Sequence, residues 1–223
     1  MRLLLLLLVS FPAFAQDDFT LLGAGMRTRP TYDGSSERTA EIIPVVRYHG
    51  QPWFARTTQG VGEAGARWNL RSGLDAGVQL AYEQGPRDRN PGASIGAHIE
   101  WDTSMGPAPL NLLARLRQHV DTGRGLQLDA RATAGVYAGH GILAGLFAQA
   151  TWASTKYFEA YYGLRDSGLL YTSFGSLASY DLATRWMMVG SLEYLRLSDD
   201  AARSAIVSRR GGGYASLGLG YRF

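Results

Sequence analysis

The sequence predicts an all-β protein, a transmembrane antiparallel up-and-down β-barrel. Three observations predict it: apolar and polar residues alternate in segment after segment, turn-forming Gly and Pro clusters separate these segments, and an apolar leader opens the chain. Alternation is expected of a barrel wall, because successive side chains of a strand point to the lipid and to the lumen. A helix would instead repeat its apolar residues every three or four positions.

Residues 1–15 have the pattern of a secretory signal peptide. An uncharged stretch from Leu3 to Phe14 follows Arg2, and Ala13-Phe14-Ala15 forms a small-x-small cleavage site. A retained membrane anchor fits less well, because about 20 apolar residues are needed to cross a bilayer. We therefore expect cleavage after Ala15 and a single domain, an outer-membrane barrel over residues 16–223.

Twelve strands are predicted between the turns, an even number as in other bacterial barrels. They are expected near residues 19–29, 41–48, 52–57, 61–69, 73–83, 92–102, 108–120, 126–137, 141–151, 170–181, 184–197 and 213–223. Merging of the short strands within 41–70 would give ten. Alternation is clearest in the segments 74–83, 93–102 and 126–137, where apolar residues are expected to face the lipid. The residues between them are expected to face the lumen, and they include Asp75, Gln79 and Glu83; His98, Glu100 and Asp102; and Gln127, Asp129, Arg131 and Tyr137.

The stretch Ala132–Ser154 carries no charged residue, so a hydropathy window would mark it as a membrane-spanning helix. Its centre, however, is the turn-like Ala138-Gly139-His140-Gly141, and Gly is a poor helix former. Apolar residues also alternate on either side of this turn. The pattern therefore favours a β-hairpin.

Connection lengths and aromatic residues orient the barrel. The long connections 30–40, 84–91, 152–169 and 198–212 are expected outside the cell, and the short links 49–51, 70–72, 103–107, 138–140 and 182–183 on the periplasmic side. Trp and Tyr favour membrane–water boundaries. We place Trp68, Trp101, Trp186, Tyr221 and Phe223 at the periplasmic rim, and Tyr82 and Trp152 at the outer rim. A soluble β-sandwich with these aromatics in its core is the alternative.

Composition excludes several classes of function. There is no Cys, which excludes disulfides, thiolate metal sites and cysteine nucleophiles. Without the leader, 21 Lys and Arg stand against 19 Asp and Glu and form no basic block, so nucleic acid is not an expected partner. The four histidines, His49, His98, His119 and His140, lack metal-ligand spacing.

No catalytic, cofactor-binding or metal-binding residue is predicted. His98, Glu100 and Asp102 share the lumen-facing parity, but alternate residues of a strand always share a face, so polar filling of the lumen explains them better than acid–base chemistry. No serine lies in a Gly-x-Ser-x-Gly elbow. We therefore expect a non-enzymatic protein; a hydrolase acting on lipid or glycan, with a site assembled from separate strands, is a less favoured alternative.

Eight charged residues of the predicted strands mostly fall on the polar, lumen-facing parity: Arg67, Glu83, Glu100, Arg115, Arg117, Asp129, Arg131 and Glu193. Buried charges must be paired or hydrated, so a structural ion-pair network and a constricted aqueous path both explain them. A twelve-strand lumen is either plugged by side chains or wide enough for small solutes.

The last residues form a strand whose apolar positions, 215, 217, 219, 221 and 223, end in Phe223. This resembles the C-terminal signature by which the barrel-assembly machinery recognises outer-membrane proteins. The predicted surroundings of the wall are therefore outer-membrane lipid.

Several motifs resemble the MltA-interacting protein (MipA/OmpV) family. They are Leu22-Gly23-Ala24-Gly25-Met26 with Arg29-Pro30-Thr31-Tyr32-Asp33-Gly34-Ser35, Tyr161-Tyr162-Gly163-Leu164 with Ser167-Gly168-Leu169, the stretch Leu192–Ala201, and the closing Gly220-Tyr221-Arg222-Phe223. The resemblance covers nearly all of the chain after the leader, and the Pro-x-Tyr-x-Gly-Ser loop is its most distinctive motif.

The resemblance implies a protein of the Gram-negative outer membrane that is a scaffold or adaptor for peptidoglycan-remodelling machinery. The implied partners are a murein transglycosylase and a murein synthase, and the family has no catalytic residues to carry over. The charged lumen supports a second hypothesis, a small-solute outer-membrane channel.

Overall fold

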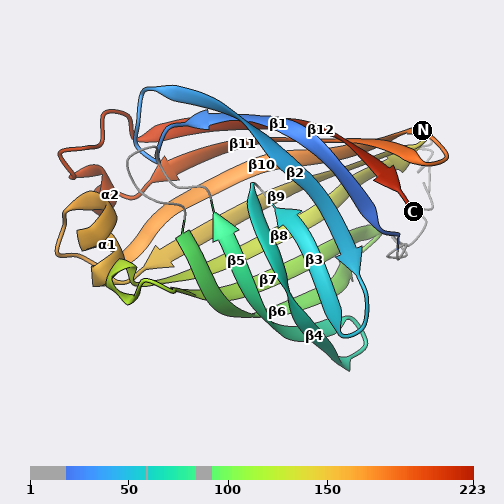
Figure 1. Ribbon diagram of the computed structural model, residues 1–223, viewed down its shortest axis with the longest axis horizontal. Helices are drawn as coiled ribbons and strands as arrows, with labels where there is room; N and C mark the ends of the chain where they lie inside the picture. Colours follow the sequence, from blue (N-terminus) through green and yellow to red (C-terminus); the bar gives the residue numbers. More distant parts are fainter. Residues whose placement is uncertain (1–18, 59, 84–91) are drawn as a thin grey trace, which may run out of the picture.

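The computed structural model describes residues 19–58, 60–83 and 92–223, and within them the chain forms twelve antiparallel strands closed into one barrel (Figure 1). The strands are β1 (Leu21–Pro30), β2 (Arg38–His49), β3 (Trp53–Thr58), β4 (Val61–Arg71), β5 (Leu74–Glu83), β6 (Gly92–Met105), β7 (Ala108–His119), β8 (Leu126–Gly139), β9 (Ile142–Ala153), β10 (Gly168–Ala183), β11 (Trp186–Leu197) and β12 (Gly211–Arg222). Consecutive strands are neighbours, and β1 pairs with β12 from Leu21↔Arg222 to Thr28↔Ala215.

The predicted fold class is confirmed, with twelve strands rather than ten. Within the described part of the chain, β3 and β4 stay separate strands that pair as a hairpin from Thr58↔Val61 to Trp53↔Ala66. The predicted signal peptide, residues 1–15, and the predicted long connection 84–91 lie outside the described residues.

The uncharged stretch 132–154 forms the predicted hairpin between β8 and β9. Its turn contains His140 and Gly141, both with positive φ, 53° and 75°. Gly accepts this left-handed conformation without the penalty that a Cβ brings. None of the helices that the structure describes is long and apolar enough to cross a membrane.

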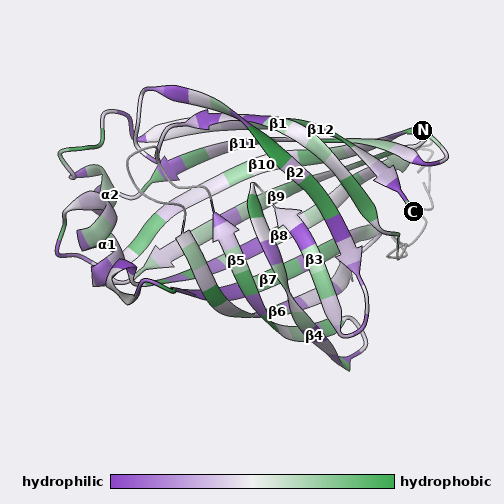
Figure 2. Cartoon of the chain, in the orientation of Figure 1, coloured by the Kyte–Doolittle hydropathy of each residue, from purple (hydrophilic) through white to green (hydrophobic). Residues whose placement is uncertain are grey.

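The outer face of the wall is apolar, and Figure 2 shows apolar bands across the strands. Ile42, Leu80 and Phe174 are at least 60 % exposed, whereas the alternate residues Gln79 and His98 are at most 5 % exposed. This is the inverse of a soluble protein, and it is expected when lipid is the surrounding solvent. The predicted rim aromatics lie on this face too: Trp68, Trp101, Trp186 and Phe223 at one end, and Tyr82 and Trp152 at the other.

One predicted facing is wrong. Tyr137 was expected to share the lumen parity of Arg131, but β8 carries a bulge between Gly135 and Tyr137. The extra residue, Val136, shifts the parity by one, so Tyr137 pairs with Ala144 and is 43 % exposed. The alternation of the residues before such a bulge stays regular, so the sequence pattern does not predict the change of face.

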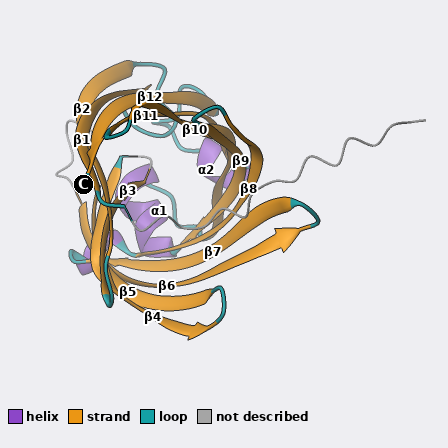
Figure 3. Cartoon of the chain, turned by 90° about the vertical axis from the view of Figure 1, so that its right-hand side faces the viewer, coloured by secondary structure: helices purple, strands orange, loops and turns teal. Residues whose placement is uncertain are grey.

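The barrel has two different ends. The short-turn end carries the tight connections around 50–52, 72–73, 106–107, 140–141 and 184–185, together with Phe19 and Phe223. The long-loop end carries 31–37, 120–125, 154–167 and 198–210. Two helices lie at the long-loop end, α1 (Thr155–Tyr162) and α2 (Asp199–Ala202), and a 3-10 turn, Thr122–Arg124, lies beside them. Figure 3, seen from the short-turn end, shows α1 across the barrel mouth.

Candidate functional site

The lumen contains a network of charged side chains that crosses from one wall to the other. Its centre is Glu63 on β4, whose side chain is 0 % exposed. Arg56 on β3 donates its Nε–H to Glu63 at 2.8 Å, and Arg115 on β7 donates a second bond. Because β5 and β6 separate β4 from β7 in the wall, the contact between Glu63 and Arg115 bridges the lumen rather than following the sheet.

The network continues from Arg115 towards the long-loop end. Asp129 on β8 accepts hydrogen bonds from Arg115 Nε at 2.9 Å and from Arg117 Nε at 3.1 Å. The hydroxyl of Thr151 donates a third bond to Asp129, at 2.8 Å. Two guanidinium groups and one hydroxyl therefore satisfy a carboxylate that is almost fully buried.

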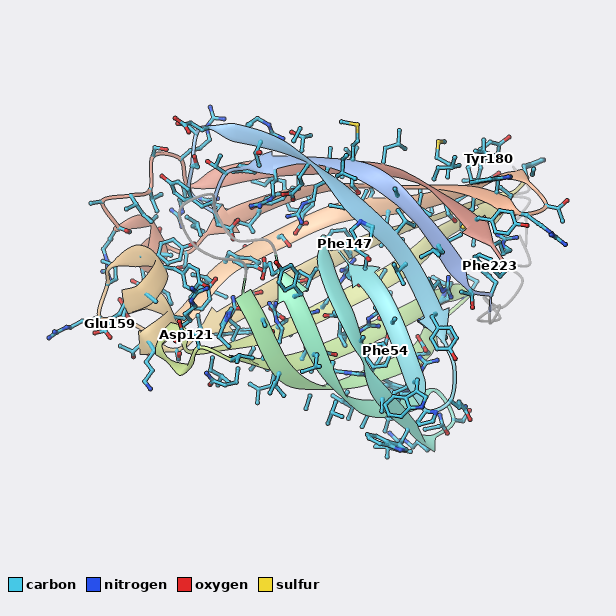
Figure 4. The ribbon with its side chains drawn as sticks, in the orientation of Figure 1. Phe54, Asp121, Phe147, Glu159, Tyr180 and Phe223 are labelled. Atoms are coloured by element: carbon cyan, nitrogen blue, oxygen red, sulfur yellow. The ribbon has the colours of Figure 1, made fainter. Side chains whose placement is uncertain are left out.

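In the other direction the network passes through Arg56 towards the short-turn end. Arg56 Nη1 donates to Glu100 at 3.1 Å. Asn111 on β7 donates to both Glu100 and Asp102, each at 2.8 Å. A continuous chain of bonded groups thus runs from Arg117 to Asp102 along one side of the lumen, which we call the packed half, formed by inward side chains of β3 to β7 with Asp129 and Thr151. Figure 4 draws the side chains of the wall and labels Phe54 on β3 and Phe147 on β9.

The described lumen is electrically balanced. The strand residues at inward positions include nine arginines and nine carboxylates: Arg27, Arg29, Arg47, Arg56, Arg67, Arg115, Arg117, Arg131 and Arg222, and Glu41, Glu63, Asp75, Glu83, Glu100, Asp102, Asp129, Asp181 and Glu193. Equal numbers of opposite charges are expected of a structural network, because a buried charge is tolerated when it is paired.

The predicted lumen charges all face inward, and His98, Glu100 and Asp102 lie on one face as expected. They bind different partners, however. His98 packs edge-on against Phe54, with ring centroids 5.3 Å apart, while both carboxylates accept bonds from Asn111. These contacts agree with polar filling of the lumen. Among the described residues, no group of three His, Asp or Glu side chains is placed to hold a metal ion.

Sequence reasoning missed the centre of the network. Glu63 was not among the predicted lumen charges, although Arg67 was, and the two residues lie at positions 63 and 67 of the same strand. Period-two alternation along 61–69 puts both on one face, so this signal was available. The bond between Glu63 and Arg115 was not predictable in the same way, because the two residues are 52 positions apart and only the closure of the barrel brings them together.

The lumen is hollow near the short-turn end, mainly beside β2 and β8 to β11. A cavity of about 780 Å³ is lined there mainly by apolar side chains, including Ile43, Val45, Phe147, Leu177, Met187 and Val189, and it meets the packed half at Asp102 and Asn111. Small residues leave this space. Gly135, Gly145, Ser191 and Ser216 are among its lining residues. We call this region the hollow half.

Arg131 stands at the boundary between the two halves and lines the cavity. Its guanidinium carbon lies 4.1 Å from the ring centroid of Phe147, a cation–π contact. Within the described chain, Arg131 forms no ion pair shorter than 4.0 Å, and its Nε is buried without a hydrogen-bond partner. It differs in this from Arg56, Arg115 and Arg117, which all bind carboxylates.

A small core closes the long-loop end. Phe158 and Tyr162 of α1 pack with Leu170, Leu197 and Ala201 from β10, β11 and α2. The helix was not predicted, since 152–169 was expected to be a loop. Ser154 at its N-cap and Gly163, with φ 67° at its C-cap, are the start and stop signals that mark it in the sequence.

The loops of this cap are joined by hydrogen bonds. Tyr32 donates to the carbonyl of Ile206 at 2.9 Å, and the N–H of Ser208 donates to the carbonyl of Gly34 at 2.9 Å. The hydroxyl of Tyr214 donates to the carboxylate of Asp33. Burial raises the pKa of Asp33 above its ordinary value, although the bond from Tyr214 opposes that rise. The cap is therefore a folded unit that covers the barrel mouth.

Comparison with known proteins agrees with the barrel fold described above. The sequence model of one family, described as MltA-interacting protein MipA, matches residues 22–223. The chain belongs to the MipA family. No curated protein matches the sequence. The predicted family is confirmed, and this MipA-family chain is an outer-membrane barrel protein.

The barrel of this MipA-family protein is similar to one of known structure. The NanC porin aligns with a TM-score of 0.57 at 10% identity, over 91% of this chain and 100% of the porin, which shows the fold. An outer membrane channel from Pseudomonas putida aligns with a TM-score of 0.45 at 9% identity, over 96% of this chain and 99% of the channel.

Proposed function

We propose that this protein is a non-enzymatic scaffold of the Gram-negative outer membrane. In this proposal its short-turn end binds a murein transglycosylase of the MltA kind, and a murein synthase joins the same assembly. The family description, MltA-interacting protein, supports the first partner. In bacterial barrels the short turns face the periplasm. The periplasm is also the compartment in which a murein enzyme acts.

The difference between the two barrel ends carries the proposal. The long-loop end is covered by α1 and its core, whereas the cavity lining reaches Phe19, Gly73 and Leu143 beside the short turns. A bridged lumen and a covered outer mouth suit a protein that presents one end to a partner. A non-enzymatic role is supported by the same network, since arginines bind Glu63, Glu100 and Asp129 and so occupy carboxylates that could otherwise act as general acid or base.

Two exposed cations mark the short-turn surface. Arg71 ends β4, and Arg185 lies in the turn between β10 and β11. Arg185 donates a hydrogen bond to the hydroxyl of Tyr221 at 2.9 Å, which raises the pKa of the guanidinium and orients it. Exposed charges at a rim govern partner choice and association rate. We assign these two arginines to the partner surface.

A binding assay with matched variants tests the scaffold. Purified barrel in lipid nanodiscs is captured, and its affinity for an MltA-type transglycosylase is measured with and without a murein synthase. The pair Arg71→Glu and Arg185→Glu reverses charge at the short-turn end and is expected to weaken binding roughly tenfold or more. The control pair, Arg165→Glu and Arg203→Glu, reverses charge at the exposed long-loop end and leaves binding unchanged. Absence of binding by the wild type, or equal loss in both pairs, contradicts the proposal.

The second candidate function is a small-solute channel. The cavity of about 780 Å³ and the charged lumen favour it, because both would hold a hydrated solute. Planar-bilayer recordings separate the two functions. A channel carries steady current, and the current rises when Phe158→Ala loosens the cap core. The scaffold carries none, with or without that substitution.

A further inference from the structure

We propose that the cavity of the hollow half binds an amphipathic anion of the fatty-acid class. In this proposal the carboxylate of the ligand pairs with Arg131, and its apolar chain lies against the cavity wall. This site is independent of any protein partner at the short-turn end.

The first argument is the state of Arg131. The neighbouring lumen arginines bind carboxylates at 3.1 Å or less, whereas Arg131 has no carboxylate within 4.0 Å among the described residues and interacts with Glu193 only at longer range. A guanidinium group away from bulk water is costly unless an anion or several acceptors bind it. Its planar donor groups match a carboxylate well. The cation therefore calls for an anionic group, and it faces the cavity.

The second argument is the apolar lining. Leu177 on β10 and Met187 and Val189 on β11 line one wall, and Ile43 and Val45 on β2 line the next. These apolar walls offer a hydrated sugar or inorganic ion no hydrogen bonds, whereas each CH₂ group of an acyl chain gains by leaving water. A volume of about 780 Å³ lies within the range of sites that enclose one small organic ligand.

The depth of Arg131 fixes the direction of the ligand. Along β8 the cavity lining runs from Arg131 through Thr133 to Gly135, and the strand ends at the short-turn end after Gly139. Arg131 is thus the innermost of the three. The carboxylate lies deep in the lumen, and the chain extends towards Leu143 near the turn.

The third argument is the neighbouring seam of the wall. Among described residues, β2 and β3 pair only at Arg47↔Arg56, Tyr48↔Ala55 and His49↔Phe54, and then separate. Val46 and Thr57, the next residues on each strand, both line the cavity. Pro44, which has no N–H to donate, lies in the stretch of β2 that pairs with β1 but not with β3, as expected of a strand edge. The cavity therefore adjoins the lipid-facing wall, where acyl chains are abundant.

A comparison of three probes tests the site. Decanoate, decanol and decyltrimethylammonium have equal chains but an anionic, a neutral and a cationic head. Their binding to the full barrel in nanodiscs is measured by calorimetry, with empty nanodiscs as the blank. We expect decanoate to bind at least tenfold more tightly than decanol and the cation to bind least. Equal affinities for the three probes, or no binding above the blank, overturn the proposal.

Three variants assign the binding to its residues. Arg131→Gln should reduce decanoate affinity at least tenfold and leave decanol unchanged. Val189→Phe, which fills the cavity, should weaken both probes. The control is Arg67→Gln, a lumen arginine that pairs with Asp75 at 3.7 Å and does not line the cavity, and it should change neither. Migration of unheated and heated samples in gels verifies folding of each variant. If folded Arg131→Gln binds decanoate as the wild type does, the site is not the one proposed.

Discussion

The two halves of the lumen are enclosed by the same kind of antiparallel wall, but one is filled by charged side chains and the other contains a cavity. In the packed half, long charged side chains from β3, β4 and β7 meet across the barrel and leave Glu63 without exposed surface. In the hollow half, aliphatic and small residues near the short-turn end line a cavity of about 780 Å³. The comparison shows that strand number does not decide whether a barrel is plugged. The side chains that face one another at a given level of the barrel decide it.

The largest expected effect is at the centre of the packed half. Glu63→Leu removes the carboxylate that joins Arg56 to Arg115, and we expect a loss of about 3 kcal/mol in unfolding free energy. The loss lies at the low end for a broken buried pair because Glu100 and Asp129 still bind the two arginines. Urea unfolding in lipid vesicles measures it. The conservative Glu63→Gln should cost less, and a neutral Glu63→Leu would remove the network from any structural role.

A smaller effect is expected in the hollow half. Met187 is 5% exposed and lines the cavity, so Met187→Ala should destabilise by about 2 kcal/mol, the low end for a buried truncation. The low value follows because the side chain already borders empty space and makes fewer contacts than a core residue. The same urea titration measures it. A loss greater than that of Glu63→Leu would reverse the ranking of the halves.

The smallest effect is expected above both halves, in the cap. Burial raises the pKa of Asp33, so the folded cap binds a proton more tightly than the open loop does. Stability from this group is present at low pH and falls as the pH rises through the raised pKa. Hydrogen exchange of residues 31–37, corrected for intrinsic rates, should therefore show more protection at pH 4 than at pH 7. Asp33→Asn should abolish the difference, and the reverse trend in the wild type would contradict the burial of this carboxyl.

Much of this architecture was predictable because a barrel wall makes local sequence informative. Alternation predicted the twelve strands and predicted that Arg115, Asp129 and Arg131 face the lumen. Local pattern fails where geometry depends on distant closure or on an added residue. The bond between Glu63 and Arg115 depends on strand register around the barrel, and the bulge at Val136 reverses Tyr137 without a change in composition. The lumen charges are balanced in number, so the sequence could not predict that Arg131 has no carboxylate within 4.0 Å.

The candidate scaffold surface was less predictable than the lumen. Turn lengths separated the two ends correctly, yet the cap core around Phe158 depends on contacts between segments 40 residues apart, from α1 to α2. Such contacts have no local signal. The sequence therefore predicted which end is elaborate without predicting that it is covered.

The division of the lumen is tested most directly by thiol labelling, because the chain contains no Cys. Ser191→Cys places a thiol in the cavity lining, and Ser94→Cys places one in the packed half, where the serine is 3% exposed. A small water-soluble thiol reagent is added to each variant in vesicles. We predict that the thiol at 191 reacts roughly tenfold faster or more, since the one at 94 must await local opening. Equal rates would contradict a lumen that is packed on one side and hollow on the other.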